Sequence, residues 1–385
     1  MQPLRPLLAA QRPLALALAL AALAAGGCGG AGGNATSGRT PQGQASTAGA
    51  ARGGHGRLTG ATGGVAGYRL RAGATTTAPG GRLFSPASLW NRQPASGAPL
   101  DPGSQAIVAA LSQEVAREEE ERRGPWINTS SYGVPLLTVP AGQPTARVQL
   151  DHAPDAALSS AWSAVPLPDG ARPAAGSDGY LVVWQPSSDR MWEFWRLNRQ
   201  ADGWHAAWGG AIMRVSENRG VYGADAWPGA KPWWGASASS LPLAAGAITI
   251  DELRRGEIDH ALAISLPDIR AGVFASPARR TDGRSDDPSS LPEGARLRLD
   301  PRVDLSRLAM PPVTRAIATA AQRYGIIVRD FAGNVTFSAQ DPTPTGSDPY
   351  HGPNGLYGGR YPDQLLASLP WSHLQVLRMD LHRRP

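Results

Sequence analysis

The chain has 385 residues, with 37 lysines and arginines against 31 aspartates and glutamates, which gives a formal net charge of +6. This length allows one large domain or two small ones, and a single cysteine excludes an intramolecular disulfide. Lys231 is the only lysine, and no basic helix interleaved with aromatic residues is present, so we expect no nucleic-acid partner.

The N-terminus has the pattern of a bacterial secretory signal. Arg5 and Arg12 supply positive charge, an unbroken Leu/Ala run covers residues 14–23, and small residues precede Cys28. The apolar run is too short for a comfortable membrane span. We interpret the segment as a lipoprotein signal with a lipobox, in which Cys28 is lipidated and Ala25 replaces the usual leucine. The protein is then anchored at the extracellular face of the cell membrane; the alternative is ordinary cleavage and secretion.

Composition divides the rest of the chain into two parts. After the signal peptide of residues 1–28, residues 29–80 are mostly Gly, Ala, Thr and Ser, and they carry too little apolar surface to offset the entropy of ordering. We interpret them as a disordered tether. Residues 81–385 then form a single β-rich domain, which is long enough for a sizeable core. We expect a monomer.

Two long segments have the period and the end signals of helices. Asp101-Pro102 is typical of a helix N-terminus, and apolar residues recur at every fourth position from Ile107. A second helix begins at Pro312 and stops at Gly325, which suits a C-terminal cap. A short third helix is expected over residues 364–369.

Residues 134–208 contain short β-rich runs bounded by proline and glycine. Two aromatic-rich runs at 180–185 and 191–197 flank five residues with turn propensity, which is the pattern of a hairpin. A third run at 204–208 follows and predicts an antiparallel meander. Two shorter runs come before it, at residues 134–139 and 146–150.

The remainder of the domain alternates between apolar runs and polar loops. Residues 209–240 show no period and predict a long ordered loop that is packed by its own aromatic residues. A short turn at 248–253 precedes the most apolar strand, 258–266, and residues 326–330 and 335–337 are expected to form a hairpin. Many short strands and few helices together predict a mainly β fold, an antiparallel β-sandwich or jelly roll with two or three peripheral helices.

Tryptophan is concentrated in the middle of the chain. Eight of the twelve tryptophans lie between Trp184 and Trp234, among several carboxylates. Flat aromatic faces beside carboxylates suit a sugar-binding cleft, and they are equally typical of an aromatic-rich core. We assign substrate binding to four aromatic residues: Trp195, Trp208, Tyr180 and Trp233.

Glu193 is the first candidate for a catalytic acid. It lies among apolar and aromatic residues on a predicted strand, where burial would raise the pKa of a carboxyl; the alternative is an ion pair with an arginine such as Arg196 or Arg214. Asp178 before the hairpin and Asp225 in the long loop are further candidates, although Asp before Gly is also ordinary turn chemistry. Two carboxyls that flank one bond would make a glycoside hydrolase.

His260 is the candidate catalytic base. Strand alternation gives it an apolar face shared with Leu262 and Ile264, which is where satisfied core histidines are more often found. On a concave sheet, the same face would let it act as a general base. A lyase would then pair it with Tyr180 or Tyr222 as the acid.

No cofactor and no metal site are expected. The sequence has no His-x-x-x-His pair and no set of cysteines, and the acidic stretches 286–287 and 341–348 match no known calcium loop. A Gly-x-Ser-x-Gly elbow is also missing, which argues against a serine hydrolase.

Three motifs are spread along the domain: Phe84-Ser85-Pro86-Ala87-Ser88-Leu89-Trp90-Asn91, Asp178-Gly179 followed by a hairpin with Trp192-Glu193, and Gly256-Glu257-Ile258-Asp259-His260-Ala261-Leu262. Together they resemble a group of uncharacterised secreted bacterial proteins. The resemblance spans about residues 84–381 and implies a secreted domain, without implying a reaction. Tyr180 stands where the resemblance leads us to expect histidine.

Two classes of function stay open. The first is a surface-anchored polysaccharide hydrolase or lyase, and it needs two titratable groups that converge in one pocket. The second is a non-catalytic glycan-binding or cell-envelope structural protein, and it needs only an exposed strip of aromatic side chains. In both, the expected partners are an envelope polysaccharide and, through the lipid anchor, the membrane.

Overall fold

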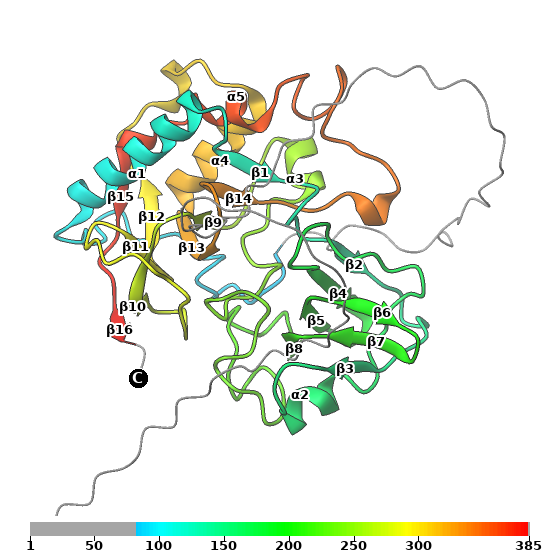
Figure 1. Ribbon diagram of the computed structural model, residues 1–385. Coiled ribbons are helices and arrows are strands. Elements are labelled where there is room, and N and C mark those ends of the chain that lie inside the picture. The colour runs from blue at the N-terminus through cyan, green and yellow to red at the C-terminus, as the bar shows by residue number, and fades with distance from the viewer. Residues whose placement is uncertain (1–81, 384–385) are drawn as a thin grey trace, which may run out of the picture. The chain divides into compact units, whose positions relative to one another are not determined.

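The structure, a computed structural model, describes residues 82–383. The predictions for the signal peptide, for Cys28 and for the tether therefore lie outside the described residues. All described residues belong to one compact unit, drawn as the coloured ribbon in Figure 1. Within this part of the chain, no helix is both long and apolar enough to cross a lipid bilayer.

The helices of the described residues are α1 (Ser104–Glu120), α2 (Ala156–Ala161), α3 (Ile250–Arg255), α4 (Pro312–Arg323) and α5 (Pro362–Leu366). α1 and α4 confirm the two long helices predicted, and Gly325 follows α4 with a φ of +87°, the left-handed cap that was expected. α3 replaces the turn expected over residues 248–253. Its start is fixed by a reciprocal capping box between Thr249 and Glu252.

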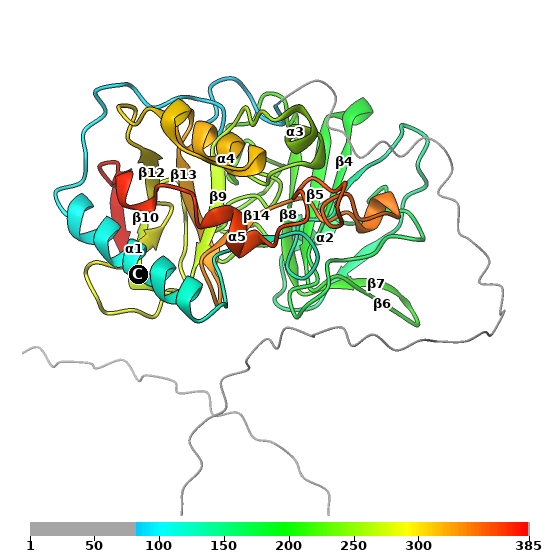
Figure 2. The ribbon, with the colours of Figure 1, turned by 90° about the horizontal axis from the view of Figure 1, so that it is seen from above.

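The largest sheet has six strands. Their order is β1 (Trp126–Asn128), β14 (Thr336–Ser338), β9 (Leu262–Leu266), β13 (Ile326–Phe331), β12 (Arg296–Leu299) and β15 (Leu374–Val376). α1 packs against β15 and α4 against β12, and Figure 2 shows both helices on the same half of the domain as β9, β12 and β13. The core between these helices and the sheet is aliphatic, with Ile264, Ile317 and Val328 among its buried residues.

β13 and β14 do not form the expected hairpin. β9 lies between them, parallel to β13 and antiparallel to β14. All five residues of β9 are buried, so both of its edges need hydrogen-bond partners inside the protein, and β13 and β14 provide them. The strand expected over residues 258–266 begins only at Leu262, which leaves His260 before it.

Three smaller sheets complete the fold. The four-stranded sheet has the order β2 (Leu136–Thr138), β4 (Leu181–Gln185), β5 (Arg190–Trp195) and β8 (Trp208–Met213). A second sheet contains β3 (Val148–Leu150), β7 (Gly203–Ala206) and β6 (Asn198–Gln200), and a third contains β11 (Leu291–Glu293), β10 (Ile269–Ala275) and β16 (Leu381–Arg383). The core beside the four-stranded sheet is aromatic, with Trp162, Trp192 and Phe194 buried in it.

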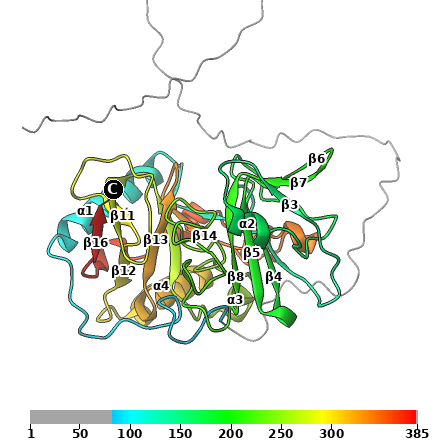
Figure 3. The same ribbon diagram turned by 90° about the horizontal axis from the view of Figure 1, so that it is seen from below.

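The predicted hairpin is confirmed, because β4 and β5 pair antiparallel. The strand predicted at residues 204–208 is present as β7, but its predicted place in the meander is wrong: β8 pairs with β5, while β7 pairs with β3 and β6. Figure 3 shows β4, β5 and β8 side by side and the β6–β7 ribbon projecting from them. A side chain at Gly209 would collide with the Glu193 carbonyl and the Trp162 ring, so the glycine that resembles a loop residue is what lets β8 approach β5.

The mainly β character is confirmed, since short strands in several sheets dominate and the helices are few. The sheets are mixed, however, because each of the four contains at least one parallel pair. An antiparallel sandwich or jelly roll does not describe this pairing. Parallel neighbours need crossover connections, which the helices and long loops of the chain provide.

Candidate functional site

Half of the eight central tryptophans are buried core residues. Those that are buried are Trp184, Trp192, Trp204 and Trp234. Those that reach the surface in part or in full are Trp195, Trp208, Trp227 and Trp233, with Trp233 51% exposed. About half of these tryptophans are therefore explained by the aromatic core, and only the tryptophans that reach the surface are available to a ligand.

Glu193 lies in the middle of β5 and is completely buried. Its carboxylate accepts hydrogen bonds from the backbone N–H groups of Ala236 (2.8 Å) and Leu243 (2.7 Å). Burial raises the pKa of Glu193, and these two N–H groups, a hydrogen bond with Tyr222 and the charge of Arg329 offset the rise only in part. Through these hydrogen bonds the carboxylate holds residues 236–243 against the four-stranded sheet, and it is not exposed to solvent.

His260 is held by its neighbours on both sides of the ring. Nε2 lies 3.0 Å from Glu252 Oε1 and Nδ1 lies 2.9 Å from the Ala261 carbonyl oxygen. Both partners are acceptors, so both ring nitrogens donate and the ring is an imidazolium. Burial lowers the pKa of His260, but the charge and the hydrogen bond of Glu252 outweigh burial and raise it.

A cavity of about 350 Å³ lies beside this ion pair. His260 and Glu252 form part of its wall, and Phe84 and Trp90 contribute apolar surface. Neither Glu193 nor Trp195 is among the residues that line it. The structure therefore does not bring Glu193, Trp195 and His260 to one concave surface.

Asp225 lies elsewhere, in a second hollow of about 370 Å³. This hollow is lined by polar groups, including Arg214, Arg219 and Arg279, together with Tyr222. No other predicted catalytic carboxylate lines it. Tyr222 connects this hollow to Glu193 through their hydrogen bond, but neither the Glu193 carboxylate nor His260 lines it.

Trp195 and Trp208 form an aromatic pair at one end of the four-stranded sheet. They stand directly opposite each other on β5 and β8, which places both side chains on one face of the sheet. The exposed His152 ring meets the Trp195 ring edge-on, with 6.5 Å between the ring centroids. We call Trp195, Trp208 and His152 the aromatic platform.

Asp178 and Arg196 adjoin the aromatic platform. The Trp195 indole N–H donates to Asp178 Oδ1 at 3.2 Å, and the Arg196 guanidinium lies over the Trp195 ring, 4.4 Å from its centroid. Asp178 is half-buried and Arg196 is exposed. These contacts fix the orientation of the indole and put hydrogen-bonding groups of both charges at its edge.

Tyr180 connects the platform to the end of β13. Its hydroxyl donates to Asp330 Oδ2 at 3.4 Å and also interacts with Asp178. Burial and the two carboxylates raise the pKa of Tyr180 well above its usual value, so the phenol stays protonated. Asp178 therefore contacts both Trp195 and Tyr180, two other residues singled out in the sequence. Tyr180 in turn contacts Asp330, a carboxyl that the sequence did not single out.

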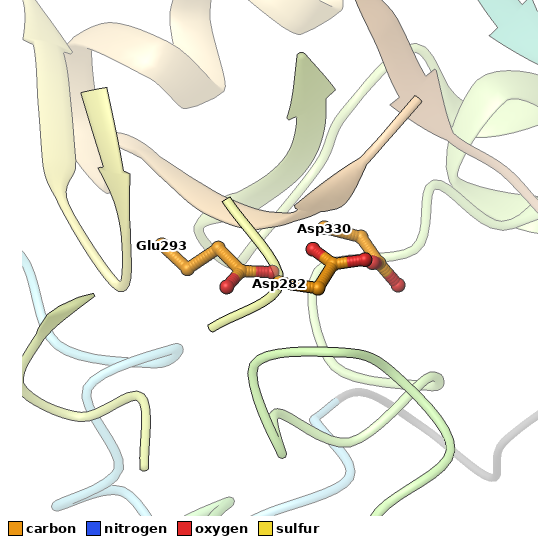
Figure 4. Close-up of side chains that lie close together, drawn as sticks. All are labelled: Asp282, Glu293 and Asp330. Atoms are coloured by element: carbon orange, nitrogen blue, oxygen red, sulfur yellow. The ribbon is translucent and has the colours of Figure 1, made fainter. Parts of the chain in front are cut away.

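Asp330 belongs to a cluster of three carboxyls with Asp282 and Glu293. Each residue offers one oxygen, and these oxygens all lie within 4.8 Å of one another; Figure 4 shows the three side chains pointing toward a common point. Burial and the neighbouring carboxyls raise the pKa of Asp330 to about 7 and that of Glu293 well above its usual value. We call Asp282, Glu293 and Asp330 the carboxyl cluster.

One feature of the sequence indicates two members of this cluster: each is a charged residue in a short, mostly apolar strand. Asp330 follows Arg329 inside the apolar run that forms β13, and Glu293 ends the short strand β11. Charged residues within apolar strands are rare unless they are paired or functional. The signal locates each residue singly, and no spacing rule joins them to Asp282.

Comparison with known proteins adds no relative: no protein-family model, no curated protein and no solved structure matches the chain. The function must therefore be argued from the site itself.

Proposed function

We propose that the domain binds a cell-envelope polysaccharide on the aromatic platform. The observation that carries this proposal is the Trp195–Trp208 pair, which is half-exposed on one face of a sheet and has Asp178 hydrogen-bonded to its edge. Aromatic faces pack against the apolar faces of sugar rings, and a neighbouring carboxylate accepts hydrogen bonds from sugar hydroxyls. The predicted lipid anchor at Cys28 would hold the platform outside the cell, where such glycans lie.

Two of the predicted catalytic residues favour binding over catalysis. Glu193 is fully buried and accepts two backbone N–H groups. His260 has both ring nitrogens in hydrogen bonds, so it has no free lone pair with which to take a proton. Each of these side chains has its hydrogen-bonding capacity used by the fold.

Polysaccharide hydrolysis is the second candidate function. It is favoured by one observation, that the carboxyls of Asp178 and Asp330 both lie beside the Tyr180 hydroxyl. Two hydrogen-bonding contacts to one oxygen keep the carboxyls within about 7 Å of each other. That separation falls in the range of about 5 to 10 Å covered by retaining and inverting glycosidases.

The binding proposal is tested with purified envelope polysaccharides, by affinity electrophoresis or a glycan array. We expect Trp195→Ala and Trp208→Ala to weaken binding about thirtyfold, the effect of truncating an aromatic residue central to an interface. The matched control is Tyr361→Ala, which removes another exposed aromatic ring, 64% exposed, from the residue that precedes α5. Melting curves of each variant separate loss of the ligand contact from loss of folding.

Unchanged binding in both folded tryptophan variants would reject the platform as the site. Hydrolysis is tested in the same samples by the release of reducing ends. If Asp178→Asn and Asp330→Asn abolish release while binding persists, the domain is an enzyme; if the wild-type protein releases none, the second candidate is rejected.

A further inference from the structure

We propose that Asp282, Glu293 and Asp330 bind one hard divalent cation of the calcium or magnesium class. This inference is independent of the glycan-binding proposal, because it concerns the carboxyl cluster and not the aromatic platform; Asp330 is shared only with the hydrolysis candidate. It also differs from what the sequence predicts, which is no metal site.

The fold brings the three carboxyls together from three separate segments. Asp282 lies in the loop after β10, Glu293 ends β11, and Asp330 is near the end of β13. β10 pairs with β11, and β11 packs against β13. The convergence is therefore a property of the tertiary structure, and no turn motif or helix end accounts for it.

Glu293 is the second observation that indicates a ligand. Its side chain is 0% exposed and neither of its carboxyl oxygens makes a well-formed hydrogen bond, although the Thr281 hydroxyl and the Asp282 N–H lie near enough to lower its pKa in part. Leaving a buried polar group without a partner is costly. A cation at the cluster would be the missing partner of this carboxylate.

The nearby arginines do not replace a cation. Arg280 donates to the Gly235 and Ser237 carbonyl oxygens at 2.9 and 2.8 Å, and Arg329 donates to the Leu243 carbonyl oxygen at 2.7 Å. Among residues 82–383, no lysine, arginine or histidine forms an ion pair with any member of the carboxyl cluster. Arg280, Arg284 and Arg329 act on the carboxyls through space only, so the negative charge of the cluster is not neutralised by direct contacts.

The spacing of the oxygens fits one ion. Calcium binds oxygen at about 2.3 to 2.6 Å, so two ligands on opposite sides of it are about 5 Å apart. The cluster's oxygens lie within 4.8 Å of one another, which lets one ion reach all three. An all-oxygen set selects hard cations over zinc or copper.

A cation can reach the carboxyl cluster from solvent, and it would keep free coordination positions there. Asp282 is exposed and Asp330 half-buried, so the cluster opens to solvent on one side while Glu293 closes the other. Three carboxylates leave several positions of a six- to eight-coordinate calcium ion for water or for an incoming hydroxyl. Tyr180, on Asp330, lies at this edge.

The test uses the mature protein, stripped with chelator and titrated with calcium and with magnesium by calorimetry. Terbium, a luminescent stand-in for calcium, gives a second readout, because the ring of Tyr180 is close enough to sensitise it. We expect one cation per chain and a melting temperature that rises with cation concentration. Asp282→Asn should weaken binding more than tenfold, and this exposed position should tolerate the change without unfolding. Glu293→Gln should do the same.

The matched control is Asp286→Asn, which removes an exposed carboxylate from the same loop and lies in an acidic stretch considered in the sequence. It should leave cation affinity unchanged. The proposal is overturned if the folded wild-type protein gives neither heat nor sensitised luminescence, since the carboxyls then hold only protons. It is equally overturned if Asp282→Asn binds as the wild type does, or if Asp286→Asn removes binding.

Discussion

Replacing Glu252 by glutamine should reveal a buried ion pair whose contribution to stability depends on pH. Glu252 accepts from the Thr249 N–H and hydroxyl as part of the helix cap, and it pairs with His260 at 3.0 Å. Glutamine keeps an oxygen for the cap and removes the charge. The side chains of His260 and Glu252 are only 15% and 8% exposed, so solvent screens the pair weakly.

The magnitude follows from distance and burial. Two unit charges 3.0 Å apart attract each other by about 5 kcal/mol at an effective dielectric constant of about 20. Removing one partner of a buried pair typically costs about 3 to 5 kcal/mol. Because glutamine can still accept a hydrogen bond from the ring, we expect a loss of about 3 kcal/mol where the imidazolium is charged.

The sign of the pH dependence is set by the two pKa shifts. The pKa of His260 in the folded protein is raised above its reference value of 6.5, so its contribution is complete below pH 6.5 and is lost as the pH rises through the raised pKa. Burial works to raise the pKa of Glu252, but the charge and hydrogen bonds of His260 and Thr249 lower it below 4.5. Its contribution is lost only in acid, as the pH falls through the lowered pKa.

The assay is denaturant unfolding of wild type and Glu252→Gln at about pH 5.5 and about pH 9. Once the pH has passed the raised pKa of His260, the ring is neutral and the pair is an ordinary hydrogen bond, so the difference should shrink to about 1 kcal/mol as the pH rises through that pKa. Asp251→Asn is the matched control, since Asp251 pairs with the exposed Arg254 on the same helix, and it should cost under about 1 kcal/mol at both pH values. An equal loss for Glu252→Gln at both pH values would refute the imidazolium assignment.

Three further changes have expected outcomes. Glu193→Gln places an amide NH₂ against one of two backbone N–H groups, so unfolding in denaturant should show a loss of about 2 to 3 kcal/mol; an unchanged midpoint would mean that the carboxylate does not hold residues 236–243. Gly209→Ala forces a methyl group into the Glu193 carbonyl and Trp162, and should cost about 3 kcal/mol or prevent folding; a melting temperature equal to that of wild type would contradict the close approach of β8. Cys28→Ser should move the protein from the membrane fraction to the soluble one, and unaltered partition would rule out lipidation.

The sequence predicts an element correctly where the residues that determine its conformation are close together in the chain. The apolar period and end residues of α1 and α4 lie within one segment each, and so does the four-residue connection, residues 186–189, that joins β4 to β5. In such cases the chain needs no distant partner to choose its conformation. Thr249 and Glu252 carried an equally local capping signal for α3, which was present in the sequence and overlooked.

The sequence does not predict the pairing of strands that are far apart in the chain. β9 pairs with β13, about sixty residues later, and the short spacing between β13 and β14 suggested a hairpin that β9 in fact interrupts. The sequence did not predict β8 because glycine is depleted in strands, while Gly209 is needed for the close approach to β5 and Gly210 for the close approach of the Tyr222 ring. Neither fact is visible within a window of neighbouring residues.

The residues of the candidate site also differ in whether they are close together in the sequence or come from distant segments. Asp178, Tyr180 and Trp195 fall within eighteen residues around one hairpin, and the sequence drew attention to all three. The carboxyl cluster joins three segments, so its members were unremarkable one at a time. The prediction that His260 shares a concave surface with Glu193 and Trp195 was wrong, because His260 precedes β9 and is held by Glu252.

The two ends of the described chain close on each other. Ser104 in α1 accepts a hydrogen bond from the Val376 N–H, the Asp101 N–H donates to the Val376 carbonyl oxygen, and Leu100 forms a bridge with Leu377. The first helix of the domain therefore has no complete docking surface until the last strands have been synthesised. Such long-range closure slows folding. If the protein is exported as an unfolded chain, as the predicted signal peptide implies, this delay would keep the domain unfolded until its C-terminus has crossed the membrane.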